Sequence, residues 1–118
     1  MNSRILFICM FFIGVSCEDI LETNISDDLV VLQLPADGFA SSTANVTFWW
    51  NELEGASSYE LLIVSPDYEN PTSLVVDSLL TKNQFTMVLP IGRYQWCVKG
   101  VNEAYKTEFN CRSIEILN

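Results

Sequence analysis

The chain has 118 residues, and its 6 basic and 15 acidic residues give a formal net charge of −9 at pH 7. A charge of this sign repels nucleic-acid phosphates and anionic lipid headgroups, so we expect neither nucleic acid nor a basic membrane-binding patch. The sequence contains no histidine, which excludes Ser-His-Asp and Cys-His catalysis and the zinc sites that depend on histidine.

The first segment along the chain, Ile5–Val15, is apolar and has Arg4 beside it. A membrane-spanning helix needs roughly 20 apolar residues, so this shorter run fits the apolar region of a secretory signal peptide instead. It ends in Gly14-Val15-Ser16-Cys17, which resembles the lipobox of bacterial lipoproteins, although that family usually has Leu where this chain has Gly14. The resemblance implies a signal peptide over residues 1–16 and a lipid, such as palmitate, on Cys17. The alternative is an ordinary cleaved signal in which the cysteine has no role.

Acidic residues follow Cys17 directly, at positions 18, 19, 22, 27 and 28. A charged segment poor in aromatic residues buries too little apolar surface to fold, so residues 17–28 are predicted to form a solvated tether. The segment also resembles the surface-export signal of Bacteroidota-type outer-membrane lipoproteins. That resemblance implies a lipid-anchored protein of the outer membrane that is exposed on the cell surface. Its alternative is attachment on the periplasmic face.

The remaining residues, 29–118, have room for one small domain. Apolar residues alternate along short segments that are separated by Pro, Gly and Asn, the pattern of an all-β sandwich or barrel. We predict seven strands: Leu29–Leu34, Ala44–Trp50, a strand around Tyr59–Ile63, Ser73–Ser78, Gln84–Leu89, a strand around Tyr94–Val98, and Thr107–Leu117.

Two stretches of this domain resemble the fibronectin type III family. The stretch "VTFWWNELEGASSYELLIV" resembles its strands B and C, with Trp50 and Tyr59 at the family's core positions. The stretch "LPIGRYQWCVKGVN" resembles its tyrosine corner and strand F, and Tyr94 is the corner residue that follows Leu89, Pro90 and Gly92. The resemblance implies a seven-stranded fibronectin type III (immunoglobulin-like) sandwich with a core built on four aromatic side chains: Trp50, Tyr59, Tyr94 and Trp96.

Cys97 and Cys111 remain once Cys9 leaves with the signal peptide and Cys17 takes the lipid. In an oxidising compartment such a pair favours a disulfide, and closing a loop of about 15 residues stabilises by about 3 kcal/mol. The midpoint between the two lies at Ala104, inside a predicted turn, so the cysteines would be directly opposed on neighbouring strands. This register places Arg112 opposite Trp96 on the inward face, which is unfavourable for a charge. Two unpaired cysteines are the alternative.

Three aromatic side chains are candidate ligand contacts: Trp49, Tyr68 and Tyr105. If Trp50 points into the core, Trp49 points outward, where it could stack on a sugar or anchor a protein partner. Alternatively, it covers the open sheet face or packs on the tether. Tyr68 and Tyr105 lie in predicted loops, and the family's topology places Tyr68 at the same end as Phe39 and Tyr105 at the other. We therefore do not expect one site made of all three.

No cofactor or metal is expected, because the acids Asp67, Glu69 and Asp77 lack the spacing of an EF-hand loop. No nucleophile motif is present, so we do not expect an enzyme. The sequence therefore predicts a lipid-anchored lipoprotein with a non-catalytic fibronectin type III-like domain. This domain would act as a binding, spacer or accessory module of a surface complex. The alternative is a glycan-binding lipoprotein of a polysaccharide-uptake system.

Overall fold

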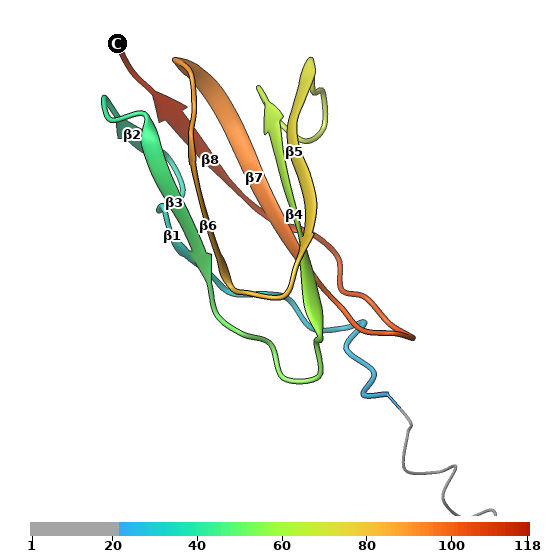
Figure 1. Ribbon diagram of the computed structural model, residues 1–118. Coiled ribbons are helices and arrows are strands. Elements are labelled where there is room, and N and C mark those ends of the chain that lie inside the picture. Colours follow the sequence, from blue (N-terminus) through green and yellow to red (C-terminus); the bar gives the residue numbers. More distant parts are fainter. Residues whose placement is uncertain (1–21) are drawn as a thin grey trace, which may run out of the picture.

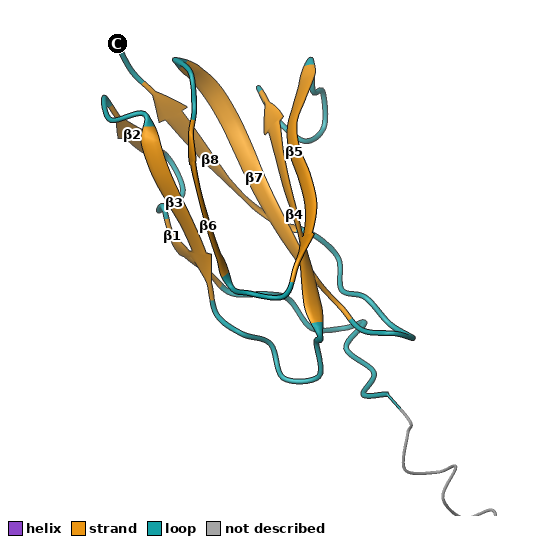
Figure 2. Ribbon diagram, in the orientation of Figure 1, coloured by secondary structure: helices purple, strands orange, loops and turns teal. Residues whose placement is uncertain are grey.

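The computed structural model describes residues 22–118. The predicted signal peptide, Cys17 and the first part of the tether lie outside the described residues. Eight strands form two sheets that face each other (Figure 1), with no helix among the described residues (Figure 2). One sheet has the order β1-β3-β6 and the other the order β2-β8-β7-β4-β5. The strands are β1 (Leu32–Leu34), β2 (Phe39–Ser41), β3 (Asn45–Trp50), β4 (Ser58–Ser65), β5 (Ser73–Leu80), β6 (Gln84–Val88), β7 (Gly92–Val101) and β8 (Asn110–Ile116).

The all-β sandwich is confirmed, with one strand more than predicted. The extra strand, β2, has three residues and pairs in parallel with β8 from Phe39↔Ile114 to Ser41↔Ile116. Such a short strand carries no readable alternation, which is why the sequence pattern missed it. The last strand begins at Asn110 rather than Thr107, because the backbone N–H of Thr107 donates to Gly100 O and holds the chain in the turn.

The alternating residues of the central strands form the core. In β3, the inward Phe48 and Trp50 are fully buried. The ring of Phe48 packs on Trp96 with centroids 5.1 Å apart, and Trp50 meets Tyr59 edge-on at 5.9 Å. Burying an aromatic side chain of this size contributes about 1.5–3 kcal/mol. All four aromatic residues expected in the core are buried, with exposed fractions of 6% or less.

Tyr94 forms the predicted tyrosine corner. Its ring is buried, and its hydroxyl donates to Pro90 O at 2.7 Å, four residues upstream. Gly92 lies in contact with this ring, and its φ of +154° is rare for other residues. Burial raises the pKa of the Tyr94 phenol. The corner thereby fixes the turn between β6 and β7.

Cys97 and Cys111 form a disulfide between directly opposed positions of β7 and β8, with Cα atoms 4.0 Å apart. The same register places Arg112 opposite Trp96. The sequence correctly predicted this unfavourable placement, and the structure shows how it is satisfied. The guanidinium reaches the other sheet and donates to three backbone carbonyls, Leu32 O at 2.7 Å, Gln33 O at 2.9 Å and Pro35 O at 3.0 Å.

Residues 22–28, the described part of the expected tether, are exposed except for Ile25, which holds the segment against the sandwich. Ile25 is fully buried although it lies outside the main core. The side-chain amide of Asn102 donates to both Thr23 O at 2.8 Å and Gly55 O at 2.9 Å. One isoleucine in a polar, acidic segment gave no signal for this contact, because its partners are loops far along the chain.

Candidate functional site

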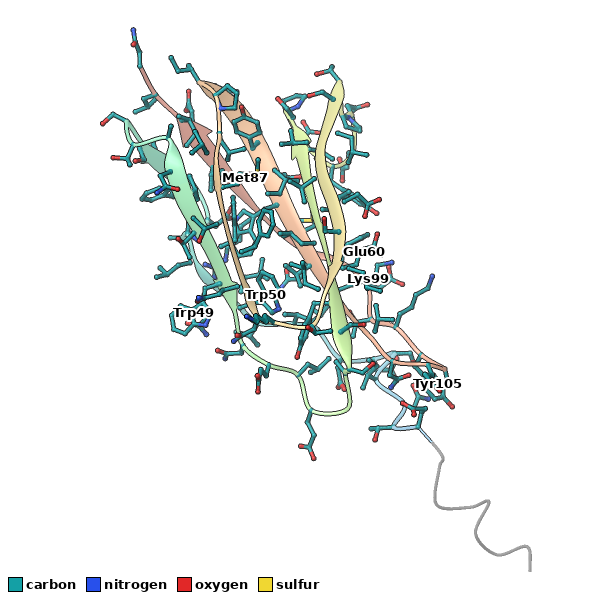
Figure 3. All side chains as sticks on the ribbon, viewed as in Figure 1. Trp49, Trp50, Glu60, Met87, Lys99 and Tyr105 are labelled. Carbon is teal, nitrogen blue, oxygen red and sulfur yellow. A yellow bond between two sulfur atoms is a disulfide. The ribbon has the colours of Figure 1, made fainter. Side chains whose placement is uncertain are left out.

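Trp49 lies on the outer face of the three-stranded sheet. It is 39% exposed and points away from the core, whereas the adjacent Trp50 points inward (Figure 3). Its cross-strand partners are Leu34 of β1 and Gln84 of β6. The outward direction is as predicted, and Trp49 lies away from the packed tether in Figure 3, so packing on the tether does not explain its position.

The exposed residues of β3 and β6 on the outer face around Trp49 are all uncharged. The exposed residues of β3 are Asn45, Thr47 and Trp49, and those of β6 are Gln84, Thr86 and Val88. Thr47 and Thr86 are joined by a hydrogen bond of 2.9 Å between their hydroxyls. In a chain with a net charge of −9, this neutral face with hydroxyls, amides and one indole suits an uncharged ligand.

A groove of about 450 Å³ adjoins this face where the chain passes from β1 to β2. We call it the β2–β3 groove. Its walls are Leu34–Ala36, Phe39 and Ser41 on one side and four residues of 43–47 on the other, and all of them are uncharged. Sequence reasoning missed this groove. No signal could have found it, because the groove depends on the change of sheet by the three-residue β2, which is too short to show an alternation.

Tyr68 lies on the outer face of the five-stranded sheet. Its ring packs edge-on against Phe109 with centroids 5.6 Å apart, and its backbone N–H donates to Gln95 Oε1 at 2.7 Å. The ammonium of Lys99 lies 4.3 Å from the centroid of the Phe109 ring. Tyr68 is 45% exposed, so part of its ring serves this internal packing and part remains free for a contact.

A carboxylate pair lies beside this aromatic cluster. Glu60 of β4 points outward next to Lys99 (Figure 3), and its carboxylate is 3.9 Å from the Lys99 ammonium. Burial, together with the hydrogen bond and the charge of Asp77, raises the pKa of Glu60, while Lys99 and Lys106 act in the opposite direction. The residues 22–118 contain no group of three or more His, Cys, Asp or Glu side chains arranged for a metal ion.

Tyr105 lies at the end of the sandwich where the chain enters (Figure 3). Its backbone N–H donates to Asn102 Oδ1 at 2.7 Å, and its carbonyl accepts from the backbone N–H of Asn102. Phe39 lies at the opposite end, where it shares a hollow with Pro66 and Asp67 of the β4–β5 loop. The structure thus separates Trp49, Tyr68 and Tyr105 into three places. The loop that carries Tyr68 shares an end with Phe39, but the Tyr68 ring itself packs on the outer face of the sheet.

Comparison of the whole fold with solved structures gives consistent matches. A fibronectin type III domain derived from the human KIAA0970 protein superposes with a TM-score of 0.58 at 15% identity, covering 92% of this chain and 86% of that one. An Fn3-like protein from Clostridium thermocellum superposes with a TM-score of 0.56 at 18% identity, covering 79% of this chain and 96% of that one. The fibronectin(III)-like modules of CbhA from Clostridium thermocellum superpose with a TM-score of 0.55 at 10% identity, covering 75% of this chain and 96% of that one.

The chain has the fibronectin type III fold. Neither the protein-family models nor the curated proteins give a match to the sequence, so the likeness is one of structure. Within this fibronectin type III sandwich, the described residues form no helix long and apolar enough to cross a membrane. Its candidate contact surfaces are the neutral face around Trp49, the β2–β3 groove, the partly exposed Tyr68 and the two loop-bearing ends.

Proposed function

We propose that this chain is a lipid-anchored outer-membrane lipoprotein whose fibronectin type III sandwich is displayed on the cell surface as a non-catalytic binding, spacer or accessory module. The anchor is the lipid on Cys17, and the acidic residues that follow it act as the export signal. The fold itself is compatible with binding and spacing roles, since such sandwiches present loops and sheet faces on a rigid scaffold.

One observation carries this proposal: a sequence that resembles a lipobox lies a few residues before a segment that is held on one end of the domain. Ile25 is buried, and Asn102 holds the backbone of Thr23. A lipid on Cys17 would therefore attach the sandwich by that end. Two or three acyl chains anchor a protein firmly without a membrane-spanning helix.

The absence of histidine from the whole sequence supports a non-catalytic role. So does the fold, since the activities that occur on such sandwiches are added by sites rather than by the scaffold. The partner would be a surface protein complex or a glycan.

The first experiment is protease shaving of intact cells that make the full chain, followed by mass spectrometry of what stays in the outer membrane. Release of the domain with a lipidated Cys17 stub left behind is the expected result. Protection until the cells are lysed would place the domain on the periplasmic face. In parallel, Cys17→Ser should move the protein from the membrane fraction to the soluble fraction, and continued membrane partitioning would exclude the lipid anchor.

A second candidate function is glycan binding in a polysaccharide-uptake system. The observation in its favour is the neutral face around Trp49, where an exposed indole lies among hydroxyl and amide side chains. Affinity electrophoresis in gels containing a neutral polysaccharide such as galactomannan tests it. Retardation that disappears with Trp49→Ala and persists with Tyr105→Ala would support it, and equal mobility with and without polysaccharide would exclude it for that glycan.

A further inference from the structure

The edge of β3 is paired with β1 at only two of its six residues. β1 pairs with β3 at Leu32↔Trp50 and Leu34↔Trp49. The chain then leaves this sheet at Pro35 and joins the other sheet as β2, which lies next to β8 (Figure 1). Residues Asn45–Phe48 therefore have β6 on one side and no strand of residues 22–118 on the other.

The backbone groups on this open side belong to Asn45 and Thr47. Trp50 N–H donates to Asn83 O, and Ala44 O accepts from Leu89 N–H, so the even-numbered residues turn toward β6. In an antiparallel pair, alternate residues turn their N–H and C=O groups to opposite sides. The odd-numbered Asn51 follows this alternation, since its N–H donates to Val31 O on the β1 side. Asn45 and Thr47 thus point two N–H and two C=O groups away from β6, and these groups have no backbone partner among residues 22–118.

These free groups face the β2–β3 groove. Asn45 and Thr47 line it, together with the buried Val46, and the opposite wall carries Phe39, which is 39% exposed. No lining residue is charged, although the chain carries a net charge of −9. A ligand that fits must supply strand-like donors and acceptors on one side and small apolar groups on the other, without a charge that would be desolvated.

We propose that the β2–β3 groove binds an extended, uncharged peptide segment of a partner protein, which continues the β1-β3-β6 sheet by pairing with Asn45 and Thr47 in line with β1. The segment takes the place that β1 leaves at Pro35. Its alternate side chains enter the groove between Val46 and Phe39, and the others face solvent beside Thr47. This inference rests on the binding role proposed above but not on the lipid anchor, so it can fail while the anchor stands.

A peptide is favoured over a saccharide at this groove because of the backbone groups. The two N–H and two C=O groups recur at the spacing of a strand, about 6.6 to 6.8 Å for every second residue. An extended peptide matches that repeat with its own N–H and C=O groups. A saccharide fits the adjacent face around Trp49 instead, where the polar groups belong to side chains.

The test is selection of a random heptapeptide display library on the full chain, with synthetic copies of enriched peptides measured by fluorescence polarisation. We expect enriched peptides with alternating apolar residues and no central Asp, Glu, Lys or Arg. Thr47→Pro removes the groove-facing N–H without breaking a β6 hydrogen bond, so it should weaken binding by about tenfold or more. The matched control Thr47→Val keeps that N–H and should bind within about twofold of the native chain.

Two further measurements keep the proposal falsifiable if Thr47→Pro does not fold. Ala36→Glu places a charge in the groove at an exposed position and should abolish binding, whereas Ala104→Glu at the opposite end should not. Methylating alternate backbone nitrogens of the peptide should also abolish binding. The proposal is overturned if no peptide is enriched, if Thr47→Pro and Ala36→Glu bind like the native chain, or if a neutral oligosaccharide such as cellohexaose displaces the peptide.

Discussion

Arg112 occupies an inward position of β8, where strand alternation predicts an apolar side chain. It is satisfied by the carbonyls of Leu32, Gln33 and Pro35, which lie at the end of β1 where that strand stops pairing. A guanidinium has five donors in a fixed fork and can bridge several acceptors at once. Asn110 acts in the same way from the same strand, donating to Val30 O at 2.9 Å. One side of the sandwich is therefore closed by side chains of β8 rather than by a continuous strand.

We predict that Arg112→Met lowers the free energy of unfolding by about 2 kcal/mol or more, because it leaves three carbonyls without their charged donor. Arg112→Lys should recover less than half of this loss, since an ammonium cannot span the same acceptors. Urea unfolding of both variants measures the effect. Arg93→Met, on the exposed part of β7, is the matched control and should change stability little. A loss below about 0.5 kcal/mol for Arg112→Met would contradict the bridging role.

Glu60 provides a residue-scale prediction of pH dependence. Its pKa is raised in the folded state, chiefly by burial and by Asp77, so the folded protein holds this proton more tightly than the unfolded chain. The resulting stabilisation is complete below the unfolded pKa of about 4.3 and is lost as the pH rises through the folded pKa. The free energy of unfolding of Glu60→Gln minus that of the native chain should therefore be larger at pH 7 than at pH 4, by less than about 1 kcal/mol.

Urea unfolding at several pH values between 4 and 7 checks this, with Glu103→Gln in the β7–β8 loop as the control for loss of one negative charge. A difference that grows in favour of the native chain as the pH rises would show that the Lys99 ion pair outweighs burial and Asp77.

For single residues, the sequence predicts the direction of a side chain on its strand but not its contacts with distant segments. Alternation predicted the direction of Trp49, Trp50 and Trp96 correctly, because a two-residue period depends only on the strand itself. Counting from the turn at Ala104 also predicted the register that joins Cys97 to Cys111. The acceptors of Arg112 and the partner ring of Tyr68 could not be predicted, because they lie on segments whose position depends on the assembled fold.

At the scale of elements, the passage from β1 to β2 is the feature with most consequences. The sequence predicted one strand that ends at Leu34, just before Pro35. That much is correct, and Gly38 has a φ of +83° and donates its N–H to Ser113 O. The three residues that then join the second sheet were too few to predict. Their change of sheet leaves the edge of β3 open and creates the β2–β3 groove.

The packed segment before β1 supports a second element-scale prediction. Gly55 has a φ of +93°, and a Cβ there would lie 2.9 Å from Ile25 Cγ2. Ile25→Ala should destabilise by about 2–3 kcal/mol, since Ile25 is fully buried. Gly55→Ala should lower the free energy of unfolding by about 1–2 kcal/mol or more, because of both the strained backbone conformation and the contact with Ile25.

The double variant separates these two causes. Removing the Ile25 side chain relieves the contact but not the backbone strain, so Gly55→Ala should cost less in the Ile25→Ala background, by about 0.5 kcal/mol or more. Thermal or urea unfolding of the four proteins measures this coupling. Additive losses would mean that the segment around Ile25 does not pack on Gly55 in solution.

At the scale of the whole molecule, the chain enters the sandwich at one end and finishes at the other (Figure 1). The β7–β8 loop, with Tyr105, lies beside the entry. The C-terminus and the loops around Phe39 and Ile91 lie at the far end, together with the β2–β3 groove. β7 runs between these ends with ten residues, which corresponds to about 33 Å. Attachment through Cys17 would thus present the groove on the side away from the membrane.

This geometry predicts the distance of each end from a bilayer. Four residues lie between Cys17 and Glu22, so under the proposed lipidation the anchored cysteine would lie within about 18 Å of Glu22. In vesicles that carry an acceptor dye on their headgroups, a donor attached through an azide-bearing residue at position 104 should transfer more energy than one at position 91. Freeing the packed segment by Ile25→Ala with Asn102→Ala should reduce the difference, because the sandwich could then tilt on its tether. Equal transfer from both positions in the native chain would show that the locked segment does not orient the domain, even if the lipid on Cys17 anchors it.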